Sequence, residues 1–179
     1  ISSLCTRKED QYQHDDAATV PEGKDKPQLL KTEMGESFIG QFMKFDNDNQ
    51  MLEIKDQNTM NKDIYVFAAV RNNTENLENP RDITFITISG TNQEIEVPVV
   101  YGADRVGEWI IIKKSINNAQ GNNFEIGGPY ADIAEIVVYN NTPSNGEIEE
   151  IKNYFLSKYR TNVLVDNGTT HIIDIESED

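Results

Sequence analysis

A series of short apolar runs, separated by clusters of Asn, Asp and Gly, constrains this chain to a β-rich fold. Several runs alternate apolar and polar residues with a period of two, which is typical of strands with one buried face. Pro98 cannot donate to a strand ladder, so we expect an edge or a bulge there. The runs lie at 38–45, 51–55, 63–71, 82–89, 93–101, 107–114, 123–128, 132–139, 162–165 and 170–175. They predict an all-β fold, a two-sheet antiparallel jelly-roll sandwich.

One segment has the period of a helix instead. Ile148, Ile151 and Phe155 recur at three- and four-residue spacing, which places them on one face of a helix. Ser144 and Glu147 have the spacing of a capping box, in which each side chain accepts a hydrogen bond from the other residue's backbone amide. We therefore predict one short α-helix at about 144–159, packed through its apolar face.

The length of 179 residues is that of one domain, so we expect a single domain over 1–179. Residues 1–35 are polar and rich in turn formers, which predicts an irregular N-terminal segment. Residues 162–179 predict C-terminal strands or a tail. The runs at 38–45 and 51–55 flank an Asp/Asn cluster at 46–49, and this arrangement predicts a β-hairpin.

The charge argues against two classes of partner. With 16 basic and 31 acidic side chains the net charge is −15, which repels both nucleic acid and anionic membrane. No apolar run approaches the ~20 residues that span a bilayer, so we expect no membrane insertion. Cys5 is the single cysteine, so an intrachain disulfide cannot form, and with two histidines we expect no zinc site.

The C-terminal half carries three consecutive motifs: DIAEIVVYN at 132–140, PSNGEI at 143–148 and YFLSKY at 154–159. Together they resemble the closing signature of LamG-like jelly-roll domains, which belong to the concanavalin A-like lectin/glucanase superfamily. Residues 123–128 are similar to the strand before that signature, 45–52 to the family's F-D-G-x-x-D-Y-L hairpin, and 26–30 to the Q-P-x-L-V segment upstream. The resemblance covers about 15–75 and 120–160.

Two parts of the family pattern have no counterpart here. The family's opening W-L-D-A strand is missing, because the chain begins near the turn that follows it, and 101–120 holds no Y-V-N-G hairpin. A missing core strand exposes backbone donors and apolar side chains on its neighbours. The resemblance therefore implies that another polypeptide chain supplies the strand, or that residues 162–176 fill its place.

Glucanases with this fold suggest a catalytic alternative. Their site resembles E-x-D-x-x-E or E-x-D-x-E on one strand, where two carboxyl groups about 5 Å apart give retention. The nearest match is 172–176, and Ile172 stands where the nucleophile should be. We therefore expect no catalytic residues and no enzyme, and a glycoside hydrolase is disfavoured.

Asp46 and Asp48 are the candidate metal ligands, because oxygen donors alternate there as in a calcium loop. Met51 and Gln57 occupy the sixth and twelfth positions, where an EF-hand needs Gly and Glu, so that motif fails and a plain turn is the alternative. The resemblance keeps Ca²⁺ a possible cofactor, since many members of the superfamily bind it.

Sugar binding needs an aromatic platform with a rim of Asn, Asp or Gln. By residue type the candidates are Tyr130, Tyr101 and Asn122. Tyr130 follows Gly-Gly-Pro at 127–129, in a predicted loop, and we expect its ring to be exposed. Trp109 lies in an apolar run, so we expect it in the core.

By analogy with the fold, these features predict a non-catalytic, lectin-like recognition or adhesion module that binds a glycan or surface polysaccharide. We expect an extracellular setting, at a cell or virion surface. The alternative is a structural role, as a decoration or fibre domain in a larger assembly such as a viral one, docked to other protein chains.

Overall fold

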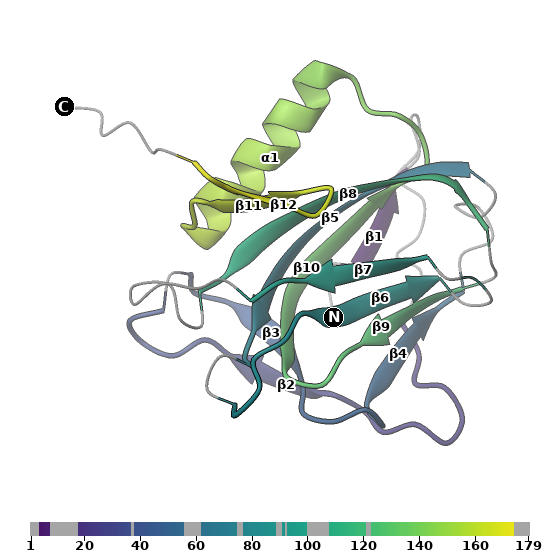
Figure 1. Cartoon of the computed structure of the whole chain (residues 1–179), viewed down its shortest axis with the longest axis vertical. Coiled ribbons are helices and arrows are strands. Elements are labelled where there is room, and N and C mark those ends of the chain that lie inside the picture. The colour runs from purple at the N-terminus through teal and green to yellow at the C-terminus, as the bar shows by residue number, and fades with distance from the viewer. Residues whose placement is uncertain are drawn as a thin grey trace.

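Two β-sheets packed face to face, with one helix laid on the larger sheet, form the chain (Figure 1). The computed structural model describes the backbone of residues 4–7 and all of 18–36, 38–55, 62–74, 77–88, 91, 93–99, 108–120 and 123–173. The elements are β1 (Leu4–Arg7), β2 (Gln28–Lys31), β3 (Gln41–Phe45), β4 (Met51–Ile54), β5 (Lys62–Asn72), β6 (Ile83–Ile88), β7 (Glu94–Val97), β8 (Ile110–Ala119), β9 (Phe124–Gly127), β10 (Ala131–Tyr139), α1 (Asn145–Tyr159), β11 (Val163–Asp166) and β12 (Thr169–Ile172).

The larger sheet has eight strands in the order β12-β11-β8-β5-β10-β3-β2, with β1 also paired to β10. The smaller sheet has four, in the order β4-β9-β6-β7. The two-sheet all-β sandwich is therefore confirmed, and so is an edge at Pro98, which directly follows edge strand β7. The pairing is antiparallel except at β1/β10 and β11/β8, which are parallel.

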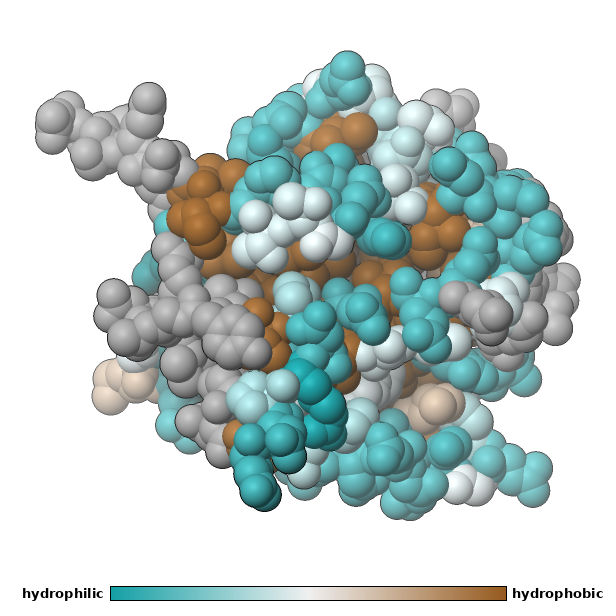
Figure 2. Space-filling view, in the orientation of Figure 1, coloured by the Kyte–Doolittle hydropathy of each residue, from teal (hydrophilic) through white to brown (hydrophobic). Residues whose placement is uncertain are grey.

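The main core lies between the sheets, and side-chain alternation on the strands builds it. On β5, Ile64, Val66, Ala68 and Val70 point inward, while Phe67 points to the outer face of the larger sheet. Seen from the side, apolar residues gather in the band between the layer with α1 and the layer with β6 and β7 (Figure 2). A second apolar cluster lies under the helix, on the outer face.

The helix confirms the prediction from the sequence. Ser144 is the N-cap of α1: its hydroxyl accepts from the Glu147 amide at 3.3 Å, and Glu147 accepts from the Ser144 amide at 2.7 Å. Phe155 and Tyr159 are buried against the sheet, with Ile148 and Ile151 beside them. No helix among the described residues is long and apolar enough to cross a membrane.

The predicted β-hairpin at 38–55 is wrong. β3 belongs to the larger sheet and β4 to the smaller one, so the turn between them crosses from layer to layer (Figure 1). The Asp46 amide donates to Gln50 Oε1 at 2.5 Å, and the Met51 amide donates to the Asp25 carbonyl at 3.2 Å. A period of two identifies strands but does not say which sheet each one joins, and this produced the error.

The prediction that residues 1–35 are irregular is also wrong in part, since they contain β1 and β2. The four side chains of β2 are all exposed, so its sequence has no alternation to detect, and it joins the sheet by backbone pairing with β3. β1 pairs with residues 136–139 of β10 and β3 with residues 131–133 of the same strand, while β11 lies beside β8. β11 and β12, which fall within residues 162–176, thus extend the larger sheet beside β8.

Candidate functional site

An open groove of about 470 Å³ lies along β3, on the outer face of the larger sheet. Its floor follows from strand register: Asp132 of β10 pairs with Lys44 of β3 on one side and with Arg71 of β5 on the other. Residues directly opposite in a sheet point to the same face, so these three charged side chains form a row across three strands. Tyr130 lies at one end of the groove, and Phe42 forms part of its wall.

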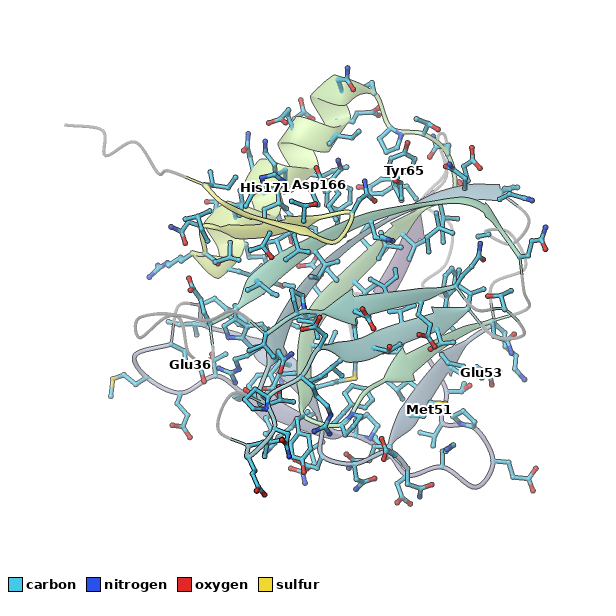
Figure 3. All side chains as sticks on the ribbon, viewed as in Figure 1. Glu36, Met51, Glu53, Tyr65, Asp166 and His171 are labelled. Carbon is cyan, nitrogen blue, oxygen red and sulfur yellow. The ribbon has the colours of Figure 1, made fainter. Side chains whose placement is uncertain are left out.

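Arg71 is held in place from several sides. Its Nε and Nη2 donate to Asp132 Oδ2 at 2.9 and 2.7 Å, and its Nη1 donates to Glu36 Oε2 at 3.1 Å. The guanidinium carbon lies 5.3 Å from the centre of the Phe42 ring and 4.7 Å from that of Trp109. Glu36, labelled in Figure 3, also accepts from Trp109 Nε1 at 3.2 Å. The charged floor of the groove is therefore rigid.

One hydrogen-bond acceptor in this floor lacks a donor among the described residues. Asp132 Oδ1 is buried and has no hydrogen-bond partner among the described residues, while the side chain as a whole is 3% exposed. A buried acceptor without a donor costs about 1–3 kcal/mol. Asp132 lines the groove, but its Oδ1 atom is itself fully buried, so this oxygen is not accessible to a molecule in the groove.

Tyr130 is anchored by its backbone and carries an exposed ring. Its φ is +67°, directly after Gly128 and Pro129, and its amide donates to the Phe45 carbonyl at 2.7 Å. The ring is exposed, as predicted, and the Arg81 guanidinium carbon lies 5.8 Å from its centre. Arg81 thus packs against the ring, and the backbone holds the residue at the groove.

The other predicted sugar-binding residues, Tyr101 and Asn122, lie outside the described residues. Trp109 is 2% exposed, which confirms its place in the core. There it contacts the rings of Phe38, Phe42 and Tyr159.

The two candidate metal ligands line different pockets. Asp46 lies in the groove and pairs with Lys44 Nζ at 3.2 Å, whereas Asp48 lines a separate pocket on the outer face of the smaller sheet. No group of three or more His, Cys, Asp or Glu in the described part of the chain is placed to hold a metal ion. Calcium binding by Asp46 and Asp48 stays a prediction from the sequence.

A second polar cluster ties the helix to the sheet. Glu135, on β10, accepts from Tyr159 Oη and from Lys158 Nζ, both at 2.7 Å, and from Tyr154 Oη at 3.2 Å. Burial and the hydrogen bond to Glu135 raise the pKa of Tyr159 far above its ordinary value of 10.0. Burial by itself lowers the pKa of Lys158, but hydrogen bonds to Glu135 and Tyr154 outweigh burial and raise it above 10.5.

The sequence analysis did not identify Arg71, Glu36 or Asp132 as site residues. Arg71 and Asp132 stand next to apolar runs, at the end of one strand and the start of another. A charged residue at the end of an apolar strand indicates a polar site on the sheet. Only the strand register shows that Arg71 and Asp132 lie side by side.

The sequence matches no protein-family model and no curated protein. A search of solved structures finds a similarity to a carbohydrate binding module from Cellvibrio mixtus lichenase 5A in complex with cellotriose. The TM-score is 0.40 at 13% identity, over 72% of this chain and 98% of that one. The fold and the function proposed below rest on this chain's own sheets and side chains.

Proposed function

We propose that this protein is a non-catalytic glycan-binding module and that the groove along β3 is its binding site. One observation carries the proposal: an exposed tyrosine ring, fixed by its backbone, lies at a groove whose floor consists of hydrogen-bonding side chains. A sugar packs its C–H face on an aromatic ring and directs its hydroxyl groups to charged acceptors and donors. The groove volume of about 470 Å³ lies within the range of ligand sites.

The state of the carboxylates supports binding rather than hydrolysis. Glu36 and Asp132 each give one oxygen to Arg71, and Asp46 is paired with Lys44. A glycosidase needs one carboxyl group as an acid and a second as a base or nucleophile, and a cation beside a carboxylate suits a base or nucleophile but not a proton donor.

The proposal has two further parts, which rest on the sequence alone. The first is membership of the LamG-like family, which rests on the motifs at 132–159. The second is an extracellular setting, with the module displayed at a cell or virion surface for recognition or adhesion.

A glycan array followed by affinity electrophoresis tests the proposal. Tyr130→Ala removes the platform, and we expect a loss of about 1.5 kcal/mol, or about tenfold in Kd. Tyr154→Ala is the matched control, since that ring is 48% exposed but lies on α1, outside the groove lining. Absence of binding to any glycan, or equal binding by Tyr130→Ala and the wild type, would refute the proposal.

A further inference from the structure

We propose that the glycan site continues past Tyr130 to Arg81, whose guanidinium donates hydrogen bonds to the sugar that follows the one on the Tyr130 ring. This inference rests on the proposed function, because it extends the same site. It specifies the ligand as a chain of linked sugars that crosses the Tyr130 ring, in contrast to a single terminal sugar.

The backbone of Arg81 is fixed by buried polar side chains. Its amide donates to Thr74 Oγ1 at 3.0 Å, and its carbonyl accepts from Asn72 Nδ2 at 2.9 Å. Thr74 and Asn72 are both buried, so water does not compete strongly for these bonds. The position from which the Arg81 side chain extends is therefore well defined, like that of Tyr130.

The guanidinium of Arg81 is available to a ligand. Arg81 is exposed, and its guanidinium forms no hydrogen bond or ion pair with the residues that the structure describes, whereas Arg71 is paired with Asp132 and Glu36. The guanidinium carbon lies 5.8 Å from the centre of the Tyr130 ring, which keeps the group beside the platform. A guanidinium carries five N–H donors in a fixed fork, and the hydroxyl and ring oxygens of a sugar are acceptors for them.

Arg81 and Tyr130 lie where two hollows of the surface meet. Tyr130 belongs to the groove along β3, while Arg81 lines a second pocket of about 330 Å³. The turn at 128–130 borders both hollows, and so does the turn at 46–50. A sugar chain that leaves the groove across the Tyr130 ring therefore comes within reach of Arg81.

The length of the groove sets the length of the ligand. Between Phe42 and Asp46 the groove follows β3 over about 13 Å, at about 3.3 Å per residue. That distance accommodates about two or three linked sugar rings. Contact with Arg81 adds one ring beyond Tyr130, so full affinity requires a chain of about three or four rings.

Calorimetric titration of the whole chain with oligosaccharides of increasing length provides the first test. The probes are laminari-, xylo-, manno- and malto-oligosaccharides, each from the disaccharide to the hexasaccharide. We expect the Kd of the wild type to fall up to about the tetrasaccharide, with about 10-fold contributed by the ring that reaches Arg81. The same Kd for the disaccharide and all longer chains would overturn the inference and leave glycan binding in place. Absence of binding by every probe, together with an empty glycan array, would overturn the proposed function itself.

Arg81→Ala provides the second test, because it removes the donors of the side chain and keeps the backbone bonds to Thr74 and Asn72. We expect the tetrasaccharide to bind about 10-fold more weakly and the disaccharide to change less than about twofold, since the shorter probe does not reach Arg81. Arg81→Lys keeps the charge but loses the planar fork, and its tetrasaccharide affinity should lie between the two.

Arg160→Ala is the matched control, since Arg160 is exposed at the C-cap of α1 and lines neither hollow. It should bind every probe as the wild type does. Wild-type affinity for the tetrasaccharide in Arg81→Ala would refute the contact with Arg81. Equal weakening of the disaccharide and the tetrasaccharide would refute it as well, because Arg81 would then act only by supporting the Tyr130 ring.

Discussion

Removing a single hydroxyl group, by Tyr159→Phe, measures how firmly the helix is fixed to the sheet. Tyr159 is 2% exposed, and its ring packs at 4.7 Å from Phe38 and 6.0 Å from Phe155, between ring centres. The substitution keeps these contacts and deletes only the 2.7 Å hydrogen bond to Glu135. The change in stability therefore reports that bond.

The structure sets the magnitude. A hydrogen bond to a charged partner contributes about 1.5–3 kcal/mol, and we expect the lower part of this range, about 2 kcal/mol, because Lys158 and Tyr154 still donate to Glu135 in the variant. For a chain of this size that corresponds to a fall in Tm of about 4–8 °C. Tyr154→Phe is the graded control: its hydroxyl lies at 3.2 and 3.4 Å from the Glu135 oxygens and the residue is half exposed, so we expect less than about 1 kcal/mol.

Urea denaturation gives both free energies of unfolding, with an unchanged m value showing that the unfolding reaction is the same. The pH dependence adds an independent check. The pKa of Tyr159 is raised on folding from its ordinary value of 10.0. Its contribution to the free energy of unfolding is therefore complete below pH 10.0 and is lost as the pH rises above that value. The pKa of Lys158 is also raised, from 10.5, so its contribution is lost in the same direction. The wild type should thus lose stability as the pH rises above about 10, and Tyr159→Phe should lose less. A variant within about 0.5 kcal/mol of the wild type, or one as alkali-sensitive as the wild type, would refute this account of the Glu135 cluster.

Two further substitutions test the turn and cap geometry. Ser144→Ala removes the N-cap of α1 and should lower the free energy of unfolding by about 1 kcal/mol in urea, whereas Asn145→Ala, one residue inside the helix, should leave it nearly unchanged. Gly128→Ala should destabilise by more than about 1 kcal/mol, because φ is +107° and the new Cβ would lie 2.6 Å from the Thr84 carbonyl oxygen. Gly146→Ala, where nothing lies within 4 Å of the new Cβ, should not destabilise, and the opposite order in a melting experiment would contradict the backbone argument.

The sequence predicted the elements whose pattern is local. The α1 stripe and cap, the buried run that became β5 and the burial of Trp109 all follow from spacing and polarity within a few residues. β2 had no such signal, because both its faces are exposed, and it is a strand only because β3 lies beside it. The layer change between β3 and β4 is likewise a property of the whole fold.

In the site, too, local features were predicted from the sequence and contacts between distant residues were not. Loop chemistry around Gly128 and Pro129 predicted an exposed Tyr130, and that exposure is confirmed. The partnership of Arg71 with Asp132 and Glu36 joins residues 61 and 35 positions apart. Strand register creates such contacts, and no spacing along the chain encodes them.

Trp109 links the groove to the helix-covered core and explains why the groove is rigid. Its ring packs on Phe42 and Tyr159, and its Nε1 donates to Glu36, which in turn holds Arg71 against Asp132. The charged row is thus ordered by folding, before any ligand arrives, and binding does not bear the entropic cost of arranging it.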